Sequence, residues 1–300
     1  MNRGYWFVLA AVTMWAIGGG YFSQVIDVPG TVLVAIASGF GAAALATMLV
    51  VRGKFRELWP ASAVIAGYLL VIALGQALNN GTFFIGLKAT SVANAQLAHN
   101  LQPVLMAVLF APLFLKERIT KAGVLAALMG FGGLALILQP SLAGGVVDAG
   151  ILWAALSAVF FALYLAVARK LKQREMVDDM VIAFWQLLIS LLVFLPAVSG
   201  YLRDGGIIAA NDWINLAIVG IVLWAASLTI LFRAFDRIPK DGTTTASVLM
   251  YLEPVIAIGI AWAAFGQPVT SLIIVGGVLI LGAAVASVLD ANRRERVKSV

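Results

Sequence analysis

The chain has 300 residues, of which 62% are apolar and only 11% are charged, and its formal net charge is +6. A soluble domain carries roughly 25% charged and ~45–50% apolar residues, so a soluble globule of this composition would expose large apolar patches. Low charge and high hydrophobicity also exclude a disordered chain. We therefore expect a polytopic membrane protein, whose 300 residues hold about ten helices of ~20 apolar residues each.

Charged or turn-rich segments divide the sequence into ten apolar stretches. Most of them lack the ~10-residue alternation of a barrel strand, and lipid admits only helices or closed barrels. The sequence therefore predicts an all-α membrane protein with ten transmembrane helices, over residues 4–25, 31–51, 60–87, 91–113, 122–138, 150–169, 181–199, 213–233, 243–265 and 270–289.

The basic residues are divided unequally between the two sides that these spans imply. Of the 20 Lys and Arg residues, 18 fall at the amino terminus, in every second loop or in the tail, and only Lys88 and Arg203 fall on the opposite side. Positively charged loops stay in the cytoplasm. We therefore expect a multi-pass protein of the cell inner membrane with both termini cytoplasmic, and we attribute the net charge to topology rather than to a nucleic-acid partner.

Several kinds of chemistry are absent from the sequence. The chain has no cysteine and a single histidine, which excludes disulfides, cysteine-ligated metals and multi-histidine metal sites. It also lacks a Walker loop, a G-x-S-x-G elbow and an H-E-x-x-H pair. We therefore expect no cofactor, no metal site and no enzymatic activity. An integral-membrane enzyme that modifies lipids stays as a remote alternative.

The two halves of the chain resemble each other. Leu101-Gln102-Pro103-Val104 matches Leu252-Glu253-Pro254-Val255 at an offset of 151 residues. Because each half holds five spans, the second half lies upside down relative to the first, and inverted repeats are typical of transporters. We expect one repeat over residues 1–140, a second over 149–290 and a central cavity between them, followed by a basic cytoplasmic tail, 291–300.

The motifs of these repeats resemble one known family. The stretch Gly86–Thr120, which includes Gln102-Pro103 and Leu115-Lys116-Glu117, and its counterpart through Leu252-Glu253-Pro254 are similar to the EamA domain of the drug/metabolite transporter superfamily. The resemblance covers the chain as two tandem domains, and amino-acid and metabolite exporters are the most similar members. It implies a cavity lined mainly by helices 1, 3, 4, 6, 8 and 9, with helices 5 and 10 at the periphery. The family's acidic residue before the fifth helix is present as Glu117, whereas its second-half equivalent is Gln267.

Polar side chains inside the predicted spans mark a candidate cavity, because such groups usually face a bundle interior or a wet cavity. Amides of the third span share one stripe, and His99 and Gln102 share an arc of the fourth. The alternative is hydrogen bonding between helices. Mid-span aromatic residues add rings, and rings with amides suit a neutral or zwitterionic organic solute. The candidate substrate-binding residues are Trp15, Gln76, Asn79, Asn80, His99, Gln102, Trp153, Ser157, Tyr164, Trp224, Tyr251 and Glu253.

Glu253 is the only acidic residue near the middle of a predicted span, about ten residues or ~15 Å from the start of its helix. It precedes Pro254 as Gln102 precedes Pro103, and each proline removes a helix hydrogen bond and favours a bend. We expect Glu253 to contact a substrate ammonium group or to carry a proton, against the alternative of a structural carboxyl group. The two prolines are candidate hinges.

These observations favour a secondary transporter that exports amino acids or similar small neutral or zwitterionic metabolites by alternating access. A proton-coupled exporter of cationic drugs that uses Glu253 stays open, as does a passive channel. The expected partners are the small-molecule substrate and the lipid bilayer. A monomer fits the sequence, and small residues leave open a dimer through the fifth and tenth helices, namely Ala122, Ala126, Gly130, Gly282 and Ala286.

Overall fold

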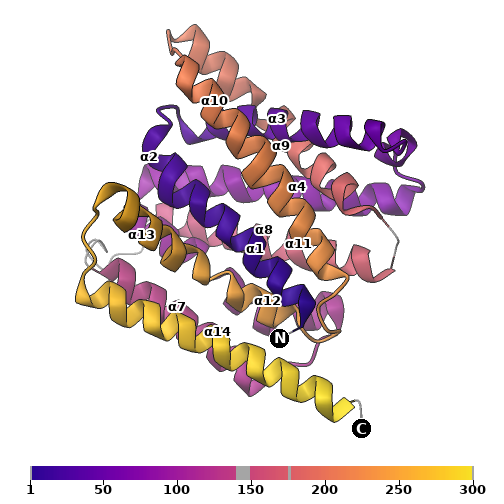
Figure 1. Ribbon diagram of the computed structural model, residues 1–300, viewed down its shortest axis with the longest axis vertical. Coiled ribbons are helices and arrows are strands. Elements are labelled where there is room, and N and C mark those ends of the chain that lie inside the picture. The colour runs from indigo at the N-terminus through magenta and orange to yellow at the C-terminus, as the bar shows by residue number, and fades with distance from the viewer. Residues whose placement is uncertain (1, 140–148, 175–176, 299–300) are drawn as a thin grey trace.

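The computed structural model describes residues 2–139, 149–174 and 177–298. Figure 1 shows how the helices of this described part are arranged. Ten helices in this described part are long and apolar enough to cross a membrane. We number them as spans 1 to 10, and they cover Arg3–Val25, Gly30–Val51, Ala63–Ala89, Val92–Leu115, Lys121–Leu138, Ala149–Arg174, Asp179–Arg203, Ala210–Phe235, Thr243–Phe265 and Ser271–Arg294. The expected all-α fold with ten spans is confirmed, and the expected boundaries differ from these by a few residues.

Six spans are single helices and four contain several segments. The single helices are α3 (Gly30–Val51), α4 (Ala63–Ala89), α7 (Lys121–Leu138), α8 (Ala149–Arg174), α9 (Asp179–Arg203) and the longer α14 (Ser271–Lys298). Span 1 joins α1 (Arg3–Ile17), η1 (Gly18–Phe22) and α2 (Ser23–Val25), span 4 joins α5 (Val92–His99), α6 (Gln102–Leu105) and η3 (Met106–Leu115), span 8 joins α10 (Ala210–Ile218), η5 (Val219–Ala226) and α11 (Ser227–Phe235), and span 9 joins α12 (Thr243–Leu249) and α13 (Leu252–Phe265).

Side-chain caps fix where several of these helices begin. The hydroxyl of Ser62 accepts from the backbone N–H of Ile65 at the start of α4, and Ser91 and Thr120 cap α5 and α7 in the same way. The carboxylate of Asp178 accepts from the N–H of Met180 at the start of α9. Each cap satisfies a backbone donor that has no partner within its own helix. Polar residues between the apolar stretches thus fix where spans 3, 4, 5 and 7 begin.

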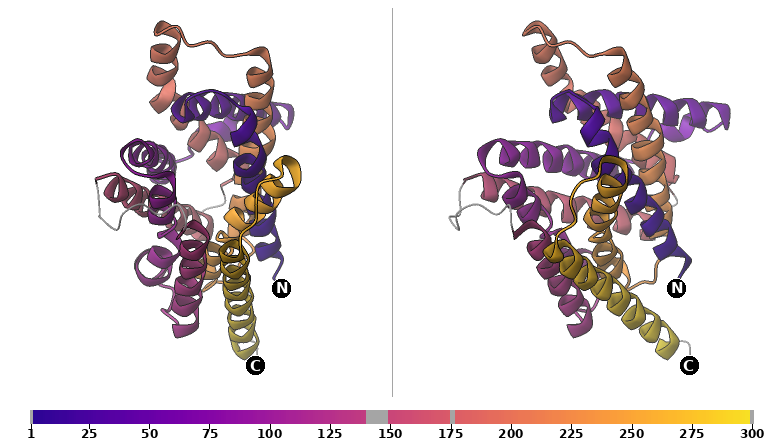
Figure 2. Two further views of the ribbon diagram at one scale, coloured as in Figure 1. Left: turned by 90° about the vertical axis from the view of Figure 1, so that its left-hand side faces the viewer. Right: turned by 60° about the vertical axis from the view of Figure 1, so that its left-hand side comes forward.

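The packing of the spans has the pattern of a pseudo-two-fold arrangement. Span 1 lies against span 8 as span 6 lies against span 3, and spans 2 and 7 pack on each other, as do spans 5 and 10. Figure 2 shows α7 and α14 side by side at one edge of the molecule. Lys116 and Gly266, 150 residues apart, both end a helix with a left-handed backbone, at φ values of 56° and 65°. Two five-span repeats of opposite orientation therefore build the molecule.

Small residues let the two repeats approach closely. A Cβ atom on Gly220 of η5 would lie 2.1 Å from the backbone oxygen of Ala37 on α3. A Cβ on Gly133 of α7 would lie 2.6 Å from the backbone oxygen of Gly276 on α14. Such backbone approaches between helices are typical of small residues in membranes. The small residues of the fifth and tenth spans therefore pack two helices of one chain against each other.

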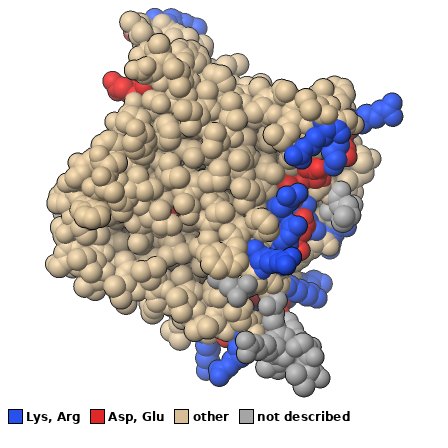
Figure 3. Space-filling view, viewed as in Figure 1, with Lys and Arg blue, Asp and Glu red and all other residues tan. Residues whose placement is uncertain are grey.

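Charged side chains gather on one side of the molecule. Figure 3 shows Lys and Arg along the edge at which both ends of the chain lie in Figure 1, whereas most of the remaining visible surface is uncharged. We call this edge the terminal side and the other the opposite side. The apolar surface between them presents many exposed large hydrophobic residues, as expected of a surface that faces lipid.

We expect Gly220→Ala to destabilise the protein, because the new methyl group would meet the backbone of Ala37. Overpacking of this kind costs about 1–3 kcal/mol. Thermal unfolding in detergent, followed by size-exclusion chromatography of the surviving protein, measures the effect. Gly259→Ala is the matched control, since a Cβ there meets nothing within 4 Å. Equal melting temperatures for the two variants would contradict the proposed close contact.

Candidate functional site

A cavity of about 310 Å³ lies between the two repeats. Its size is at the lower end of the ~300–1,000 Å³ range of small-molecule sites. Spans 1, 2, 3, 4, 6, 7, 8 and 9 line it, and spans 5 and 10 supply none of its lining residues. The lining residues are Trp15, Gly18, Gly19, Phe22, Ser23, Leu33, Ser38, Gln76, Asn79, Asn80, His99, Phe161, Tyr164, Leu187, Ser190, Val219, Trp224, Leu228 and Glu253.

Eight of the twelve candidate residues lie in this lining. They are Trp15, Gln76, Asn79, Asn80, His99, Tyr164, Trp224 and Glu253. They come from six spans and include every titratable candidate except Tyr251. The structure thus brings together the amides of span 3, the rings of spans 1, 6 and 8, and the carboxyl group of span 9.

Four candidates lie outside the lining. Gln102 is buried and donates to the hydroxyl of Ser247 at 3.2 Å, and the hydroxyl of Tyr251 donates to the backbone oxygen of Asn100 at 3.0 Å. Ser157 is buried behind His99, and Trp153 is 41% exposed. The arc expected for His99 and Gln102 assumed a continuous helix, but the chain is interrupted between α5 and α6. This interruption changes the helical phase and directs Gln102 toward span 9.

The amides of span 3 form a connected group with unused hydrogen-bonding capacity. Asn80 Oδ1 accepts from Gln76 Nε2 at 3.3 Å and from Asn79 Nδ2 at 3.4 Å, and Gln186 Nε2 donates to Gln76 Oε1 at 3.2 Å. Asn79 Oδ1 is buried without a hydrogen-bond partner among the described residues. Buried polar atoms normally have partners, so this oxygen is suited to a polar group on a bound solute.

Two serines of the lining escaped the sequence analysis. The hydroxyl groups of Ser38 on α3 and Ser190 on α9 are buried and, within the described part of the chain, have no hydrogen-bond partner. Ser38 has no polar residue three or four positions away in the sequence, so periodicity gives no stripe that would detect it. Ser190 follows Gln186 by four positions, and this spacing, which places both residues on one helix face, is the signal that could have found it. Spans 2 and 7 therefore contribute polar groups that the family resemblance did not assign to them.

His99 belongs to an aromatic wall. Its ring stacks on Phe161 with a centroid distance of 5.4 Å, and Phe161 stacks on Tyr164 at 5.3 Å. Its Nδ1 lies 2.7 Å from the hydroxyl of Ser157, which itself donates to the backbone oxygen of Ala154. Since the serine proton is already used, Nδ1 is the donor to Ser157, and Nε2 of a neutral ring is then an acceptor.

Among the described residues, Glu253 is the only Asp, Glu, Lys or Arg that lines the cavity. It lies in the first turn of α13. Its carboxyl group makes no hydrogen bond or ion pair with the described residues. An intramembrane carboxyl group that faces a cavity without a partner is a functional-site candidate.

Both repeats are interrupted at equivalent positions beside the cavity. The break between α5 and α6 covers Asn100 and Leu101, and the break between α12 and α13 covers Met250 and Tyr251. Each break comes shortly before a candidate hinge, Pro103 or Pro254, which lacks the backbone N–H that would continue the helix. Interrupted helices at corresponding places of two repeats are typical of transporter binding sites.

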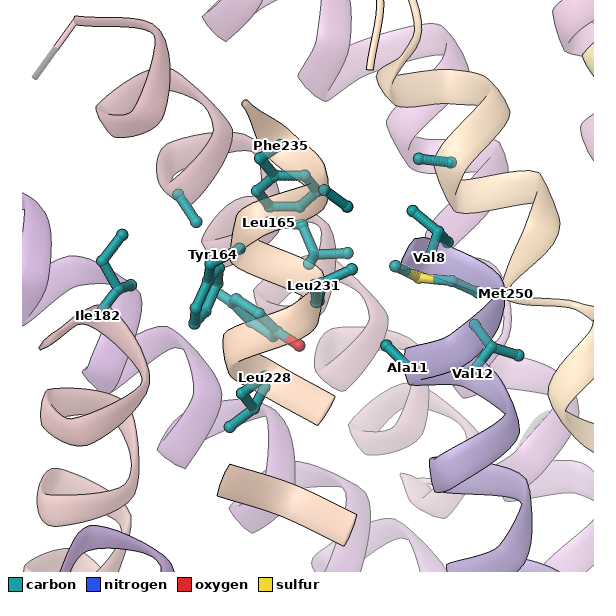
Figure 4. Packing of buried hydrophobic residues seen from close by; sticks show 14 of the residues in the cluster. Val8, Ala11, Val12, Tyr164, Leu165, Ile182, Leu228, Leu231, Phe235 and Met250 are labelled. Carbon is teal, nitrogen blue, oxygen red and sulfur yellow. The ribbon is translucent and has the colours of Figure 1, made fainter. Parts of the chain in front are cut away.

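The cavity is closed toward the terminal side by packed apolar residues. Figure 4 shows part of this cluster, in which Val8 of α1, Leu165 of α8 and Phe235 of α11 are all buried. Each lies nearer the terminal side of its span than the lining residues Trp15, Tyr164 and Leu228. The lining instead extends toward the opposite side.

Polar contacts also join neighbouring segments on the terminal side, where the cavity is closed. Both carboxylate oxygens of Glu117, between spans 4 and 5, lie 3.2 Å from the backbone N–H of Thr243, which donates to them at the start of α12. The buried guanidinium of Arg169 donates to the backbone oxygens of Ile238 and Pro239 at 3.1 and 2.9 Å. Burial raises the pKa of Glu117 from its ordinary value of 4.5 to about 7, although Thr243 and Arg169 oppose this rise. Glu117 thus joins the first repeat to the second where the cavity is closed.

Two inverted repeats of five spans, a cavity between them and paired helix interruptions define a multi-pass membrane protein of the transporter class. The model of the EamA-like transporter family matches residues 2–139 and 148–289, so the chain belongs to that family. The resemblance inferred from Gln102-Pro103, Glu117 and Leu252-Glu253-Pro254 is confirmed.

Individual relatives agree with this assignment. The chain is 30% identical to the pseudopaline exporter CntI of Pseudomonas aeruginosa over 225 residues, which cover 73% of each chain. It is 26% identical to the uncharacterized transporter YdfC of Bacillus subtilis over 230 residues, or 75% of this chain and 71% of that protein. A crystal structure superposes with a TM-score of 0.80 at 20% identity, over 97% of this chain and 99% of the other, and supports the fold.

We expect Glu117→Gln to remove a pH dependence of stability. Because the pKa of Glu117 is higher in the folded protein, its protonated form stabilises the fold, fully below about pH 4.5 and no longer above about pH 7. The free energy of unfolding should fall by on the order of 3 kcal/mol across this window in the unsubstituted protein. Thermal unfolding at about pH 5 and about pH 8 checks the difference between the two proteins. Parallel pH profiles would show that Glu117 does not titrate at the closed side, next to Arg169 and Asp241.

Proposed function

We propose that this chain is a secondary carrier of the inner membrane that exports amino acids or similar small neutral or zwitterionic metabolites by alternating access. The observation that carries the proposal is the composition of the cavity. One carboxyl group without a partner, Glu253, faces amides, hydroxyls and aromatic rings, and no lysine or arginine lines the cavity within the described part of the chain. Such a site suits a solute with an ammonium group and offers no fixed cation to a phosphate.

The polar groups can be divided between the two ends of a zwitterion. The carboxylate of Glu253 accepts from a substrate ammonium group in a charge-assisted hydrogen bond. The hydroxyl groups of Ser38 and Ser190 can donate to a substrate carboxylate, because neither has a hydrogen-bond partner among the described residues. The rings of Trp224, Phe161 and Tyr164 supply the apolar wall that orients the remainder of the solute.

The closed terminal side and the extension of the cavity toward the opposite side support alternating access. Movement of repeat 1–140 against repeat 149–290 would separate Glu117 from Thr243 and expose the cavity to the terminal side. The interruptions before Pro103 and Pro254 provide the places at which spans 4 and 9 can bend. Such movement of one repeat against the other around a fixed site is the general mechanism of carriers with inverted repeats.

The distribution of basic residues supports the orientation. The terminal side carries almost all Lys and Arg residues, so we place this side and both termini in the cytoplasm. The cavity of this structure then faces away from the cytoplasm. Export as the direction of transport is supported by the relative that is named a pseudopaline exporter.

A second candidate function rests on Glu253 alone. A carboxyl group that binds either a proton or a cation, but not both, couples the movement of one to the opposite movement of the other. The same site would then export cationic drugs in exchange for protons. The two candidates differ in their dependence on a pH gradient and in the charge of the solute.

We expect saturable transport of a zwitterionic solute in a liposome panel of amino acids and organic cations. Liposomes that contain the purified protein are loaded with one unlabelled solute at a time. Uptake of the labelled form of that solute is then measured with and without a proton gradient. Counterflow of an amino acid without dependence on the gradient supports the leading candidate, and gradient-dependent uptake of cations supports the second. Unsaturable flux of every solute would contradict a carrier and indicate a channel.

We expect Glu253→Gln to reduce transport of the identified solute by on the order of tenfold to one-hundredfold, because it removes a charge-assisted hydrogen bond. The initial rate in liposomes across a pH series is the measurement. A proton carrier also loses its pH dependence on this substitution, whereas a simple ammonium site loses affinity at every pH. Asp204→Asn, an exposed acid at the opposite side, is the control. An unchanged rate and pH profile for Glu253→Gln would rule out both roles.

A further inference from the structure

A second, larger cavity opens on the terminal side between the repeats. Its volume is about 1280 Å³, which exceeds the ~300–1,000 Å³ of common small-molecule sites. Residues 44–69 of the first repeat form one wall, and residues 172–181 and 221–237 of the second repeat form the other. We call it the terminal cleft. It shares no lining residue with the central cavity.

The charges of the terminal cleft do not balance. Six basic and four acidic residues line it. Each of the four acids forms a salt bridge with one of two lysines. Lys54 pairs with Asp178 at 2.7 Å and with Glu57 at 3.3 Å. Lys172 pairs with Asp179 at 2.7 Å and with Asp236 at 2.9 Å. These two lysines and four acids together carry a formal charge of −2, so the net positive charge of the cleft comes from its four arginines, Arg52, Arg56, Arg233 and Arg237.

These arginines are exposed and weakly engaged. Within the described part of the chain, Arg52, Arg56 and Arg237 form no ion pair, and Arg233 reaches Asp179 only at 3.4 Å. Arg52 Nη1 lies 3.3 Å from the sulfur of Met180, the residue next to Asp179, so Arg52 and Arg233 converge on the start of α9 from the two repeats. Guanidinium groups in such a cluster favour bidentate contacts with phosphate oxygens.

The remainder of the cleft is apolar and reaches into the membrane. Met48 of α3 and Ile221 of η5 line it and are 47% and 43% exposed. Ile221 lies near the middle of span 8, roughly 24 Å along the helix from Arg237 at 1.5 Å per residue. The terminal cleft thus joins a basic mouth at the membrane surface to an apolar wall within the hydrocarbon region.

We propose that the terminal cleft binds a phospholipid with an anionic headgroup from the adjacent leaflet. The headgroup phosphate lies among Arg52, Arg56 and Arg233, and one acyl chain lies along Met48, Ile221 and the small residues Ala225 and Ala226. Basic pockets between transmembrane helices on the cytoplasmic side bind anionic lipid headgroups in this manner. A soluble phosphate compound would use the arginines and leave the apolar wall without a partner. The lipid would therefore bridge the two repeats.

Lipid retention and lipid-dependent stability test the proposal on the full-length protein in an uncharged detergent. Phosphatidylglycerol and phosphatidylcholine with identical acyl chains are titrated, and bound lipid is counted by native mass spectrometry while the melting temperature is recorded. We expect one phosphatidylglycerol to be retained preferentially and to raise the melting temperature, and phosphatidylcholine to do neither. A separate arm with millimolar inorganic phosphate distinguishes a free phosphate from a lipid headgroup.

The double variant Arg52→Gln with Arg56→Gln tests the residues, since neither side chain takes part in an ion pair among the described residues. We expect about tenfold weaker retention of phosphatidylglycerol and, without lipid, an unchanged melting temperature. The double variant Arg118→Gln with Lys121→Gln is the matched control. Both residues are exposed on the terminal side outside the cleft, and the two substitutions remove the same amount of positive charge. The control should retain the lipid as the unsubstituted protein does.

Four outcomes would overturn the proposal. Equal retention of the two lipids would show an apolar surface without headgroup recognition. Equal stabilisation by inorganic phosphate, with displacement of phosphatidylglycerol, would assign the arginines to a soluble anion. Undiminished retention by the cleft variant, or equal loss in the control, would place the lipid elsewhere. If the cleft variant fails to fold, the comparison of the two lipids and inorganic phosphate on the unsubstituted protein still tests whether the protein recognises an anionic lipid headgroup.

Discussion

The structure depends on one constraint, which is that lipid offers no hydrogen bonds to backbone N–H and C=O groups. The chain satisfies most of these groups within ten helices, and several of its departures from regular helix lie beside the central cavity. The interruptions before Gln102 and Leu252 lie beside the central cavity, at equivalent places of the two repeats. The same holds for the π-helical segments η1 and η5, both of which supply lining residues. Irregular backbone therefore lies beside the central cavity in both repeats, whereas the π-helical segment η3 supplies none of its lining residues.

Polar side chains follow the same constraint and create the site. Asn79, Ser38 and Ser190 would be costly on a lipid-facing surface, and they are buried around the cavity instead. A buried polar group that has no hydrogen-bond partner costs about 1–3 kcal/mol. A solute that supplies the missing partners recovers this free energy. Under the proposed function, affinity for a small polar solute would thus arise from these groups.

Sequence alone predicted the spans and most of the cavity, because both depend on local patterns. A stripe of amides predicted Gln76 and Asn80 as cavity residues, and the mid-span depth of its carboxyl group predicted Glu253. Gln102 was placed incorrectly relative to His99 by the assumption of a continuous helix, since a break of two residues changes the helical phase. The contacts of Glu117 with Thr243 were not predictable, because they join positions 126 residues apart through packing alone.

The two repeats share geometry but differ in chemistry, and this difference accounts for which side of the cavity is closed. Lys116 and Gly266 end equivalent helices with left-handed backbones, and each is followed by the residue that would fasten its own side. On the terminal side that residue is Glu117, whose carboxylate is buried against the start of α12. On the opposite side it is Gln267, which is exposed. Glu117 accepts from the N–H of Thr243 across the repeats, and within the described part of the chain the side chain of Gln267 makes no corresponding contact. The repeats therefore share the left-handed helix end but not the polar contact after it, and the side that has the contact is the closed one.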